Sequence, residues 1–182
     1  RRGAIVVGPD MATTRPGIYA AGDVTDRDQF VYMAAYGAKI AVNNAFGLEP
    51  MLYNNATMPW VVFTDPQVAG VGLSEAQARA AGHEVKTSVL GLDNVARALA
   101  ARDTRGLIKL VADARTDRLL GGQIVAPEGA DSIQTLAMAL KMGMTARALG
   151  ETIFPYLTTV EGLKLAAQTF DKDVAKLSCC AG

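Results

Sequence analysis

A short stretch rich in proline and asparagine divides this chain into two parts of different character. The segment LEPMLYNNATMP, from Leu48 to Pro59, has the composition of a connection between domains. The first fifty or so residues read as one structural unit, whereas the residues beyond the segment alternate between strand and helix patterns of the α+β class. The sequence therefore predicts two units, residues 1–54 and 55–182.

The first unit is predicted to contain two short strands and one helix. Residues 3–7 (GAIVV) and 18–23 (IYAAGD) are apolar runs bounded by turn residues, as is typical of strands. From Phe30 to Phe46 the apolar residues recur at helical spacing, and Gly47 is placed to end that helix.

The second unit is predicted to contain a sheet. Residues 60–63 (WVVF) read as a buried strand, followed by a turn at Thr64-Asp65-Pro66. The runs LIKLV (107–111) and LLGGQIV (119–125) flank the polar segment ADARTDR, which is the pattern of a β-hairpin. We therefore expect an antiparallel sheet accompanied by helices.

Capping residues predict the helices of this second unit. Ser74 with Gln77 fits a capping box, in a helix that Gly82 would end. Asp131 or Ser132 is expected to cap a helix that runs through Met142, and Thr145 to cap another. A last helix is predicted from an apolar stripe at helical spacing, formed by Leu163, Ala166, Phe170, Val174 and Leu177.

Charge and composition exclude several classes of function. Eighteen acidic residues balance eighteen basic ones, so no nucleic-acid partner is expected. No apolar run approaches the ~20 residues of a membrane span. Two cysteines do not make a disulfide framework, which favours a reducing cytoplasm. The chain opens on Arg1 rather than Met, which we interpret as a fragment or a processed product.

The segment GVGLSE, from Gly70 to Glu75, superficially resembles a dinucleotide-binding loop. The third glycine of that motif is replaced by Glu75, whose carboxylate would repel a pyrophosphate. We interpret the segment as a glycine-rich turn leading into the helix capped by Ser74.

The segment RPGIYAAGDV (15–24) places a carboxylate where a strand is expected to end. Gly22 would let a ligand approach the backbone, and Asp23 would accept hydrogen bonds from sugar or ribitol hydroxyls. The helix that follows would direct its positive end at the same ligand. On the residues alone, an aspartate that merely caps a turn is the simpler alternative.

The only two cysteines, Cys179 and Cys180, are adjacent and close to the end of the chain. A trans peptide holds neighbouring Cα atoms ~3.8 Å apart, which is less than the ~4.4 Å minimum of most disulfides. A structural bridge between them is therefore not expected. Paired thiolates select large, soft cations, and Lys172 and Lys176 would favour the thiolate forms. The alternative is a pair of incidental thiols.

The pattern T-x-P-G-I-Y-A-x-G-D, which ends at Asp23, resembles the second flavin-binding motif of the flavoprotein disulfide reductases. The resemblance implies that residues 1–54 are the C-terminal segment of an α/β FAD-binding domain. It implies that Asp23 binds the FAD ribitol beside Gly22, and that the helix opening at Gln29, Phe30 and Val31 points at the flavin.

The stretch MPWVVFTDPQVAGVGLSEAQA, which starts at Met58, is similar to the start of that family's interface domain. The resemblance then covers nearly the whole chain and implies a homodimer formed through residues 55–182. It also implies that the first flavin motif, the redox-active disulfide and the NADPH site lie upstream of Arg1.

The segment FPYLTTVEG departs from the pattern of family members that act on disulfides. Those members carry a histidine five positions before the glutamate, but that position holds Tyr156 before Glu161. The only histidine of the chain is His83, beside Gly82. A tyrosine, with a reference pKa near ~10, is a poor acid–base catalyst for thiols at neutral pH. The resemblance therefore indicates a substrate other than a disulfide.

The segments FPYLTTVEGLKLAAQTF and KLSCCAG closely resemble the branch of the family that reduces mercury(II). The resemblance implies that Cys179 and Cys180 capture Hg(II) from its thiol complexes and pass it to the redox cysteines of the partner subunit. Tyr156 and Glu161 would act at the same site, with Tyr156 as a ligand of the ion, and NADPH would supply electrons through FAD. Two alternatives stay open, namely another disulfide reductase of the family and a stand-alone dimerisation or metal-binding module.

Overall fold

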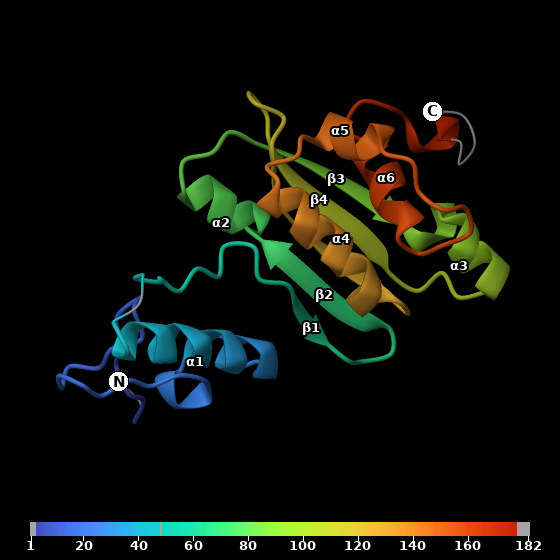
Figure 1. Ribbon diagram of the computed structural model, residues 1–182. Helices are drawn as coiled ribbons and strands as arrows, with labels where there is room; N and C mark the ends of the chain where they lie inside the picture. Colours follow the sequence, from blue (N-terminus) through green and yellow to red (C-terminus); the bar gives the residue numbers. More distant parts are fainter. Residues whose placement is uncertain (1–2, 48, 178–182) are drawn as a thin grey trace. The chain divides into compact units, whose positions relative to one another are not determined.

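The chain forms two compact units, Arg1–Asn55 and Ala56–Gly182 (Figure 1). The computed structural model describes residues 3–47 and 49–177. Cys179 and Cys180 lie outside the described residues. Each unit has a hydrophobic core of its own, so the two are described separately.

The first unit is built on one long helix, α1 (Val31–Ala45), preceded by the short 3₁₀ helix η1 (Asp23–Thr25). The predicted helix from Phe30 to Phe46 is confirmed, because these two residues are its N-cap and C-cap. Gly47 follows with a φ of 69°, the left-handed conformation that ends many helices.

The prediction of two strands in the first unit is wrong. Residues 3–7 and 18–23 make only isolated bridges, Val7 with Thr13 and Ala12 with Tyr19. A strand needs a run of paired backbone groups, and Met11, with a φ of 64°, reverses the chain between these segments. Of their apolar residues, Val7, Ala20 and Ala21 pack into a small core around Met11 and Ile40, which are 1% and 0% exposed, whereas Ile5, Val6 and Ile18 are exposed.

The second unit contains the predicted antiparallel sheet. Its five strands are arranged in the order β1-β2-β5-β4-β3, and every neighbouring pair is antiparallel. The strands are β1 (Trp60–Val62), β2 (Gln67–Gly72), β3 (Val85–Gly91), β4 (Leu107–Asp113) and β5 (Leu119–Ala126). The predicted hairpin is confirmed as β4 and β5, whereas β2 and β3 are strands that the sequence patterns did not reveal.

Two sequence interpretations near the edge of the sheet need correction. Strand β1 exists but is not buried, because it is an edge strand, and Phe63 just beyond it is 78% exposed. Gly70 to Gly72 belong to β2 rather than to a turn. A Cβ at Gly70 would lie 2.4 Å from the Trp60 ring, so glycine serves close packing between the strands.

The helices of the second unit are α2 (Glu75–Ala80), α3 (Ala96–Ala101), α4 (Gly129–Lys141), α5 (Ala146–Glu151) and α6 (Glu161–Gln168), together with the 3₁₀ helices η2 (Leu92–Asn94) and η3 (Val174–Lys176). The capping box of Ser74 and Gln77 is confirmed at α2, and so is the cap that Thr145 forms on α5. Helix α4 begins earlier than predicted, because Glu128 occupies its N-cap position.

The predicted last helix is shorter than its apolar stripe. Helix α6 ends at Gln168, where the Thr169 hydroxyl turns back to donate to the Ala166 carbonyl at 2.9 Å. The Ser88 hydroxyl of β3 donates to the same carbonyl at 2.6 Å. The end of the helix is thereby fixed to the sheet, and Phe170, Val174 and Leu177 still pack against the core from the segment that follows.

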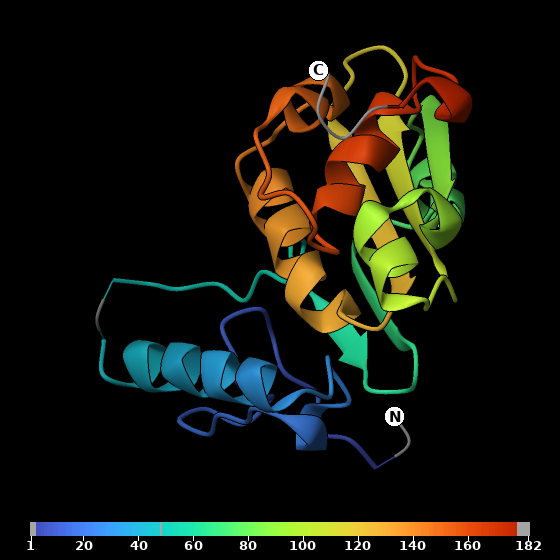
Figure 2. The ribbon, with the colours of Figure 1, turned by 90° about the vertical axis from the view of Figure 1, so that its right-hand side faces the viewer.

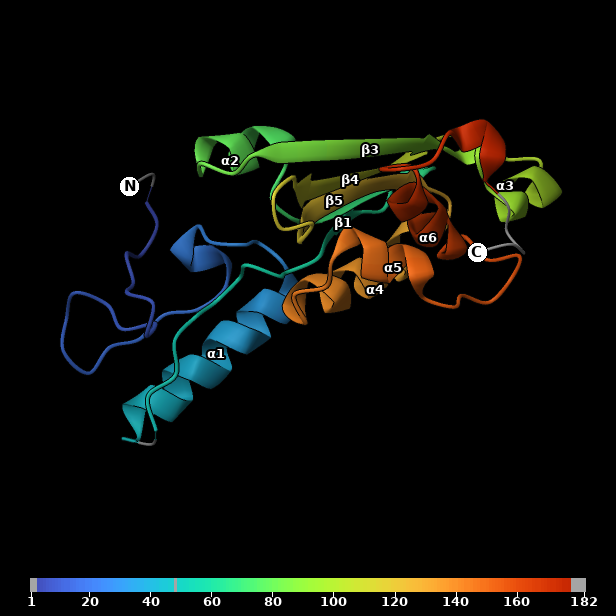
Figure 3. The ribbon, with the colours of Figure 1, turned by 90° about the horizontal axis from the view of Figure 1, so that it is seen from above.

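Helices α4, α5 and α6 lie on the same face of the sheet (Figures 2 and 3). The core between them is made of aliphatic side chains, among them Leu90, Ile108, Leu110, Ile124, Leu136 and Leu163, each at most 1% exposed. No helix of the described ranges is both long and apolar enough to cross a membrane.

Glycines let α4 approach the sheet closely. A Cβ at Gly122 of β5 would lie 2.6 Å from the Cδ2 atom of Leu136. A Cβ at Gly72 of β2 would lie 2.4 Å from the Cδ2 atom of Leu140 and equally close to a backbone carbonyl. Since such contacts are shorter than real packing allows, α4 can occupy this position only over strands that carry no side chain there.

The turn of the β4–β5 hairpin is organised by Asp113, which is 4% exposed. Its Oδ2 atom lies 3.1 Å from Nδ1 of His83, while Oδ1 accepts hydrogen bonds from the Arg115 and Thr116 amides and the Thr116 hydroxyl. The bond with His83, followed by those from Thr116 and Arg115, holds the pKa of Asp113 well below its usual range. His83 thus has a structural partner.

Replacing Asp113 by asparagine is expected to lower the thermal midpoint at pH 7. A carboxyl with a depressed pKa in the folded state contributes stability above its unfolded pKa of about 4. That contribution is lost as pH falls through the folded pKa, so the difference between Asp113→Asn and the unaltered chain should shrink in acid. Thermal unfolding followed by circular dichroism from pH 7 down to about pH 2 measures this loss, which begins below the unfolded pKa of about 4, with exposed Asp171→Asn as the control. A difference that does not change with pH would contradict the role of the ionised carboxylate.

Candidate functional site

Residues 152–160 form a loop between α5 and α6, and this loop carries Tyr156. The Tyr156 side chain is 60% exposed. The Thr158 hydroxyl donates to the Pro155 carbonyl at 2.8 Å and accepts from the Glu161 amide at 3.3 Å. Leu157 between them has a φ of 64°. The loop is therefore a tight turn folded directly onto the start of α6.

A second set of contacts ties this loop to α4 and α3. Thr159, which is 7% exposed, donates its hydroxyl hydrogen to Oε2 of Glu128 at 2.6 Å. The Oε1 atom of the same carboxylate accepts from Nη2 of Arg97 at 3.4 Å. Glu128 is the N-cap residue of α4, so one carboxylate links three elements and fixes the base of the loop.

Glu161 is the first residue of α6 and one of the few buried charged residues. Its side chain is 2% exposed, and its Oε2 atom has no hydrogen-bond partner among the residues that the structure describes. A buried carboxylate oxygen without a partner is costly to the fold. Such groups are found more often where function, rather than stability, explains them.

In the first unit, the structure brings together the residues predicted to bind a cofactor. Gly22 adopts a φ of 77°, and a Cβ there would lie 3.1 Å from that of Ala34 in α1. Asp23 follows as the exposed first residue of η1, and its carboxylate forms no hydrogen bond within the described part of the chain. Gly22 and Asp23 therefore lie beside the first turns of α1.

The N-terminus of α1 has no side-chain cap. Phe30 is its N-cap and offers no side-chain acceptor to the first amides. Val31 is 85% exposed, and Gln29 donates to Asp26 at 3.4 Å rather than to the helix. The positive end of a helix that is 15 residues long thus faces outward beside the Asp23 carboxylate.

Several features of the second unit could not be found by sequence reasoning. Glu128 and Thr159 are separated by 31 residues, and nothing in the local sequence predicts their contact.

The Hg(II) ligands predicted in the tail, Cys179 and Cys180, lie outside the described residues. Over the ranges that the structure describes, no three His, Cys, Asp or Glu side chains gather in an arrangement that could hold a metal ion.

Comparison with curated proteins shows extensive similarity to mercuric reductases. The chain is 56% identical over 181 residues to a mercuric reductase from Shigella flexneri. The alignment covers 100% of this chain and 32% of that protein. It is 54% identical over 181 residues to one from Bacillus cereus, covering 100% of this chain and 29% of that protein. The chain thus spans about a third of the length of the relatives it matches.

Solved structures agree with the fold. The flavoprotein disulfide reductase RclA from Escherichia coli superposes with a TM-score of 0.84 at 30% identity, over 92% of this chain and 39% of that one. LpdA from Mycobacterium tuberculosis superposes with a TM-score of 0.83 at 28% identity, and the match covers 93% of this chain and 37% of that one.

A family model described as the dimerisation domain of pyridine nucleotide-disulphide oxidoreductases matches residues 58–167. This range contains the whole antiparallel sheet, helices α4 and α5, and all of α6 except its last residue, Gln168. The chain therefore belongs to the pyridine nucleotide-disulphide oxidoreductase family, and its second unit contains the family's dimerisation domain.

Proposed function

We propose that the chain is the C-terminal part of an enzyme that reduces Hg(II) to Hg(0). The observation that carries this proposal is the similarity to mercuric reductases over the whole chain, at 56% identity to the protein from Shigella flexneri. Tyr156 supports it, since a tyrosine at the position of the family's catalytic histidine is unsuited to protonating a thiol.

In the proposed reaction, Cys179 and Cys180 take Hg(II) from its soluble thiol complexes. Thiolates are the preferred ligands of soft cations, and exchange between thiolates moves the ion without releasing it. Tyr156, exposed on its fixed loop, would contribute an oxygen ligand or hydrogen bond, with Glu161 buried at the base of the same loop. The redox cysteines that receive the ion would belong to the partner subunit.

The first unit supports the proposal that residues 1–54 are the last part of an FAD-binding domain. Asp23 would accept hydrogen bonds from the ribitol hydroxyls, and Gly22, without a Cβ, lets the preceding backbone lie close to Ala34 at the start of α1. The amides that begin α1 at Gln29, Phe30 and Val31 would face acceptors on the flavin ring. When bound, FAD would supply the two electrons that originate from NADPH, in the reducing environment of the cytoplasm.

Residues 55–182 would form the interface domain of a homodimer. Exposed apolar side chains gather on α4 and the α5–α6 loop, where Met138, Met142 and Ile153 are 52%, 75% and 95% exposed. Such a patch on a small domain is typical of a protein interface. A second copy related by two-fold symmetry would cover it.

The purified 182-residue chain is therefore expected to sediment as a dimer at micromolar concentration. The variant Ile153→Glu places a charge in the apolar patch without altering the core, and it should shift the population towards monomer. Val89→Glu, on β3, is a matched control because Val89 is also exposed, at 53%, and lies away from the patch. A chain that remains monomeric at high concentration would contradict this interface.

The catalytic proposal is tested on the full-length parent enzyme. With FAD bound, it should oxidise NADPH when Hg(II) is added and release mercury vapour in equal amount. The 182-residue chain alone should show no such activity. An enzyme that reduces glutathione disulfide or lipoamide but not Hg(II) would instead support the alternative, another disulfide reductase of the family.

A further inference from the structure

Two consecutive threonines, Thr158 and Thr159, hold the backbone around Tyr156 by different contacts. The Thr158 hydroxyl closes the turn itself, because it donates to the Pro155 carbonyl at 2.8 Å. The Thr159 hydroxyl donates at 2.6 Å to Oε2 of Glu128, which lies 31 positions earlier in the chain. The first contact shapes the turn that contains Tyr156, and the second joins this turn to α4.

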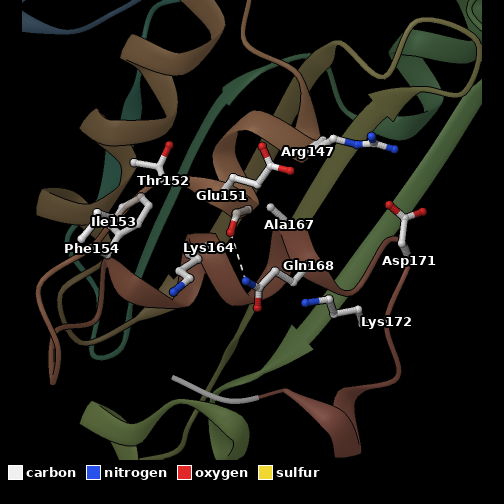
Figure 4. A pocket seen from close by; sticks show the side chains of 11 residues that line it. Arg147, Glu151, Thr152, Ile153, Phe154, Lys164, Ala167, Gln168, Asp171 and Lys172 are labelled. Carbon is white, nitrogen blue, oxygen red and sulfur yellow. Dashed lines mark hydrogen bonds between the residues drawn. The ribbon is translucent and has the colours of Figure 1, made fainter. Parts of the chain in front are cut away.

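The start of the same loop is held by the helices that flank it. The Gln168 side chain of α6 donates to the Gly150 carbonyl of α5 at 3.0 Å, as Figure 4 shows. Thr152, the C-cap of α5, donates its hydroxyl hydrogen to the Ala148 carbonyl at 2.8 Å. Both ends of the loop are therefore tied to the fold, and Tyr156 lies between them.

Glu128 occupies the N-cap position of α4, but its side chain does not cap that helix. The Ala130 amide, in the first turn of α4, instead donates to Oε1 of Gln67 from β2 at 2.8 Å. That amide is one that an N-cap side chain ordinarily binds. Because Gln67 satisfies it, the two oxygens of the Glu128 carboxylate bind Thr159 and Arg97.

Of these two contacts of Glu128, the one with Thr159 is the stronger. It is a short, charge-assisted bond of 2.6 Å to a hydroxyl on a residue that is only 7% exposed. The ion pair with Arg97 spans 3.4 Å between side chains that are 39% and 45% exposed, and such pairs contribute little. The hydrogen bond between Thr159 and Glu128 is therefore the anchor of this end of the loop.

We propose that Thr159 and Glu128 are positioning residues, which hold Tyr156 in the place from which it acts on Hg(II). The inference rests on the proposed function, because it assumes that Tyr156 acts on the ion. Neither Thr159 nor Glu128 touches the ion, and each acts through the backbone of the loop. Displacement of a reacting group by about 1 Å can lower a rate by up to about a hundredfold. A fixed loop thus contributes to turnover without contributing a ligand.

The test uses Thr159→Val and Thr159→Ser in the full-length enzyme. Thr159→Val removes the donor but keeps the shape of the side chain, and turnover of Hg(II) should fall about fivefold through misplacement of Tyr156. Thr159→Ser keeps the hydroxyl and should restore the turnover that Thr159→Val loses. Reduction of FAD by NADPH should be the same in both variants and in the unaltered enzyme.

A double variant separates positioning from a general structural role. Adding Thr159→Val to Tyr156→Phe should cause little further loss of turnover, because the hydroxyl that the anchor positions is already gone. An equal loss in both backgrounds would overturn the proposal, and so would full turnover in Thr159→Val alone.

Thr64→Val is the matched control for Thr159→Val. The Thr64 hydroxyl also donates to a backbone oxygen, the Pro66 carbonyl at 2.7 Å, but in an exposed turn outside the loop. It should leave turnover unaltered. Sedimentation is the second control, because Ile153 of the same loop belongs to the proposed dimer patch. Thr159→Val should sediment as the unaltered enzyme does, and a loss of turnover caused by dissociation would overturn the proposal.

Hydrogen exchange separates this inference from the proposed function. The Glu161 amide donates to Oγ1 of Thr158 at 3.3 Å, and the Gly162 amide donates to the Thr159 carbonyl at 3.0 Å. In mass spectrometry of the full-length enzyme, peptides that contain these amides should exchange faster in Thr159→Val and at the original rate in Thr159→Ser. This result would support the anchor even for an enzyme that does not reduce mercury. Equal exchange in all three proteins would overturn the inference, even if mercury is reduced.

Discussion

Replacement of both Cys179 and Cys180 by alanine in the full-length enzyme is expected to abolish turnover of mercury held by strong thiol buffers. The tail pair supplies the only thiols of this chain, so no other thiolate within it could take over capture. Small, weakly bound mercury species could reach the redox cysteines directly, and with them the defect should shrink. The measurement is NADPH oxidation with mercury bound to glutathione and with mercury as a halide complex.

The same pair offers a test of which subunit it serves. Cys179 and Cys180 are the second and third residues after Leu177, the C-cap of η3, and each residue extends the chain by at most ~3.6 Å. So short an arm suits a site at the dimer interface. Two inactive parents, one without the tail pair and one without the redox pair, should regain activity when they form mixed dimers. Mixed dimers as inactive as their parents would show that the tail does not act across the interface.

Tyr156→Phe is expected to slow mercury turnover about tenfold or more, as for loss of one hydrogen bond or ligand to a charged group. The change removes only a hydroxyl from a side chain that is 60% exposed, so the fold should be unaffected. Reduction of FAD by NADPH, followed by stopped-flow absorbance, should be unchanged.

Tyr36→Phe is the matched control for this variant. The Tyr36 hydroxyl contacts the Leu52 carbonyl in the first unit at 3.5 Å and is not assigned to the mercury site. It should leave mercury turnover unaltered. Equal turnover in Tyr156→Phe would identify Tyr156 as a packing residue.

The features that the sequence predicted correctly are those set by local interactions. The capping box of Ser74 and Gln77 and the cap by Thr145 use groups three residues apart, so their signal is contained in a few letters. The helix from Phe30 to Phe46 was equally clear, because its apolar spacing spans four turns.

The errors arose where distant segments decide the outcome. Gly70 and Gly72 read as a turn because nothing nearby reveals the Trp60 ring or the Leu140 side chain that need the space. The stripe from Leu163 to Leu177 packs against the core, buried at Leu163 and Ala166 and partly buried beyond, but α6 ends at Gln168, where Ser88 and Thr169 bind the Ala166 carbonyl. Likewise, no pattern indicated that Glu128 would fix the loop that carries Tyr156.

The close seating of α4 over Gly72 and Gly122 has a consequence for assembly. A helix packed this tightly cannot shift or rotate on the sheet without steric overlap, so its outward face, with Met138 and Met142, has one fixed shape. On the proposed dimer, that face would be ready before a second copy arrives. Little conformational entropy would then be lost on docking, and the subunits would associate as rigid bodies.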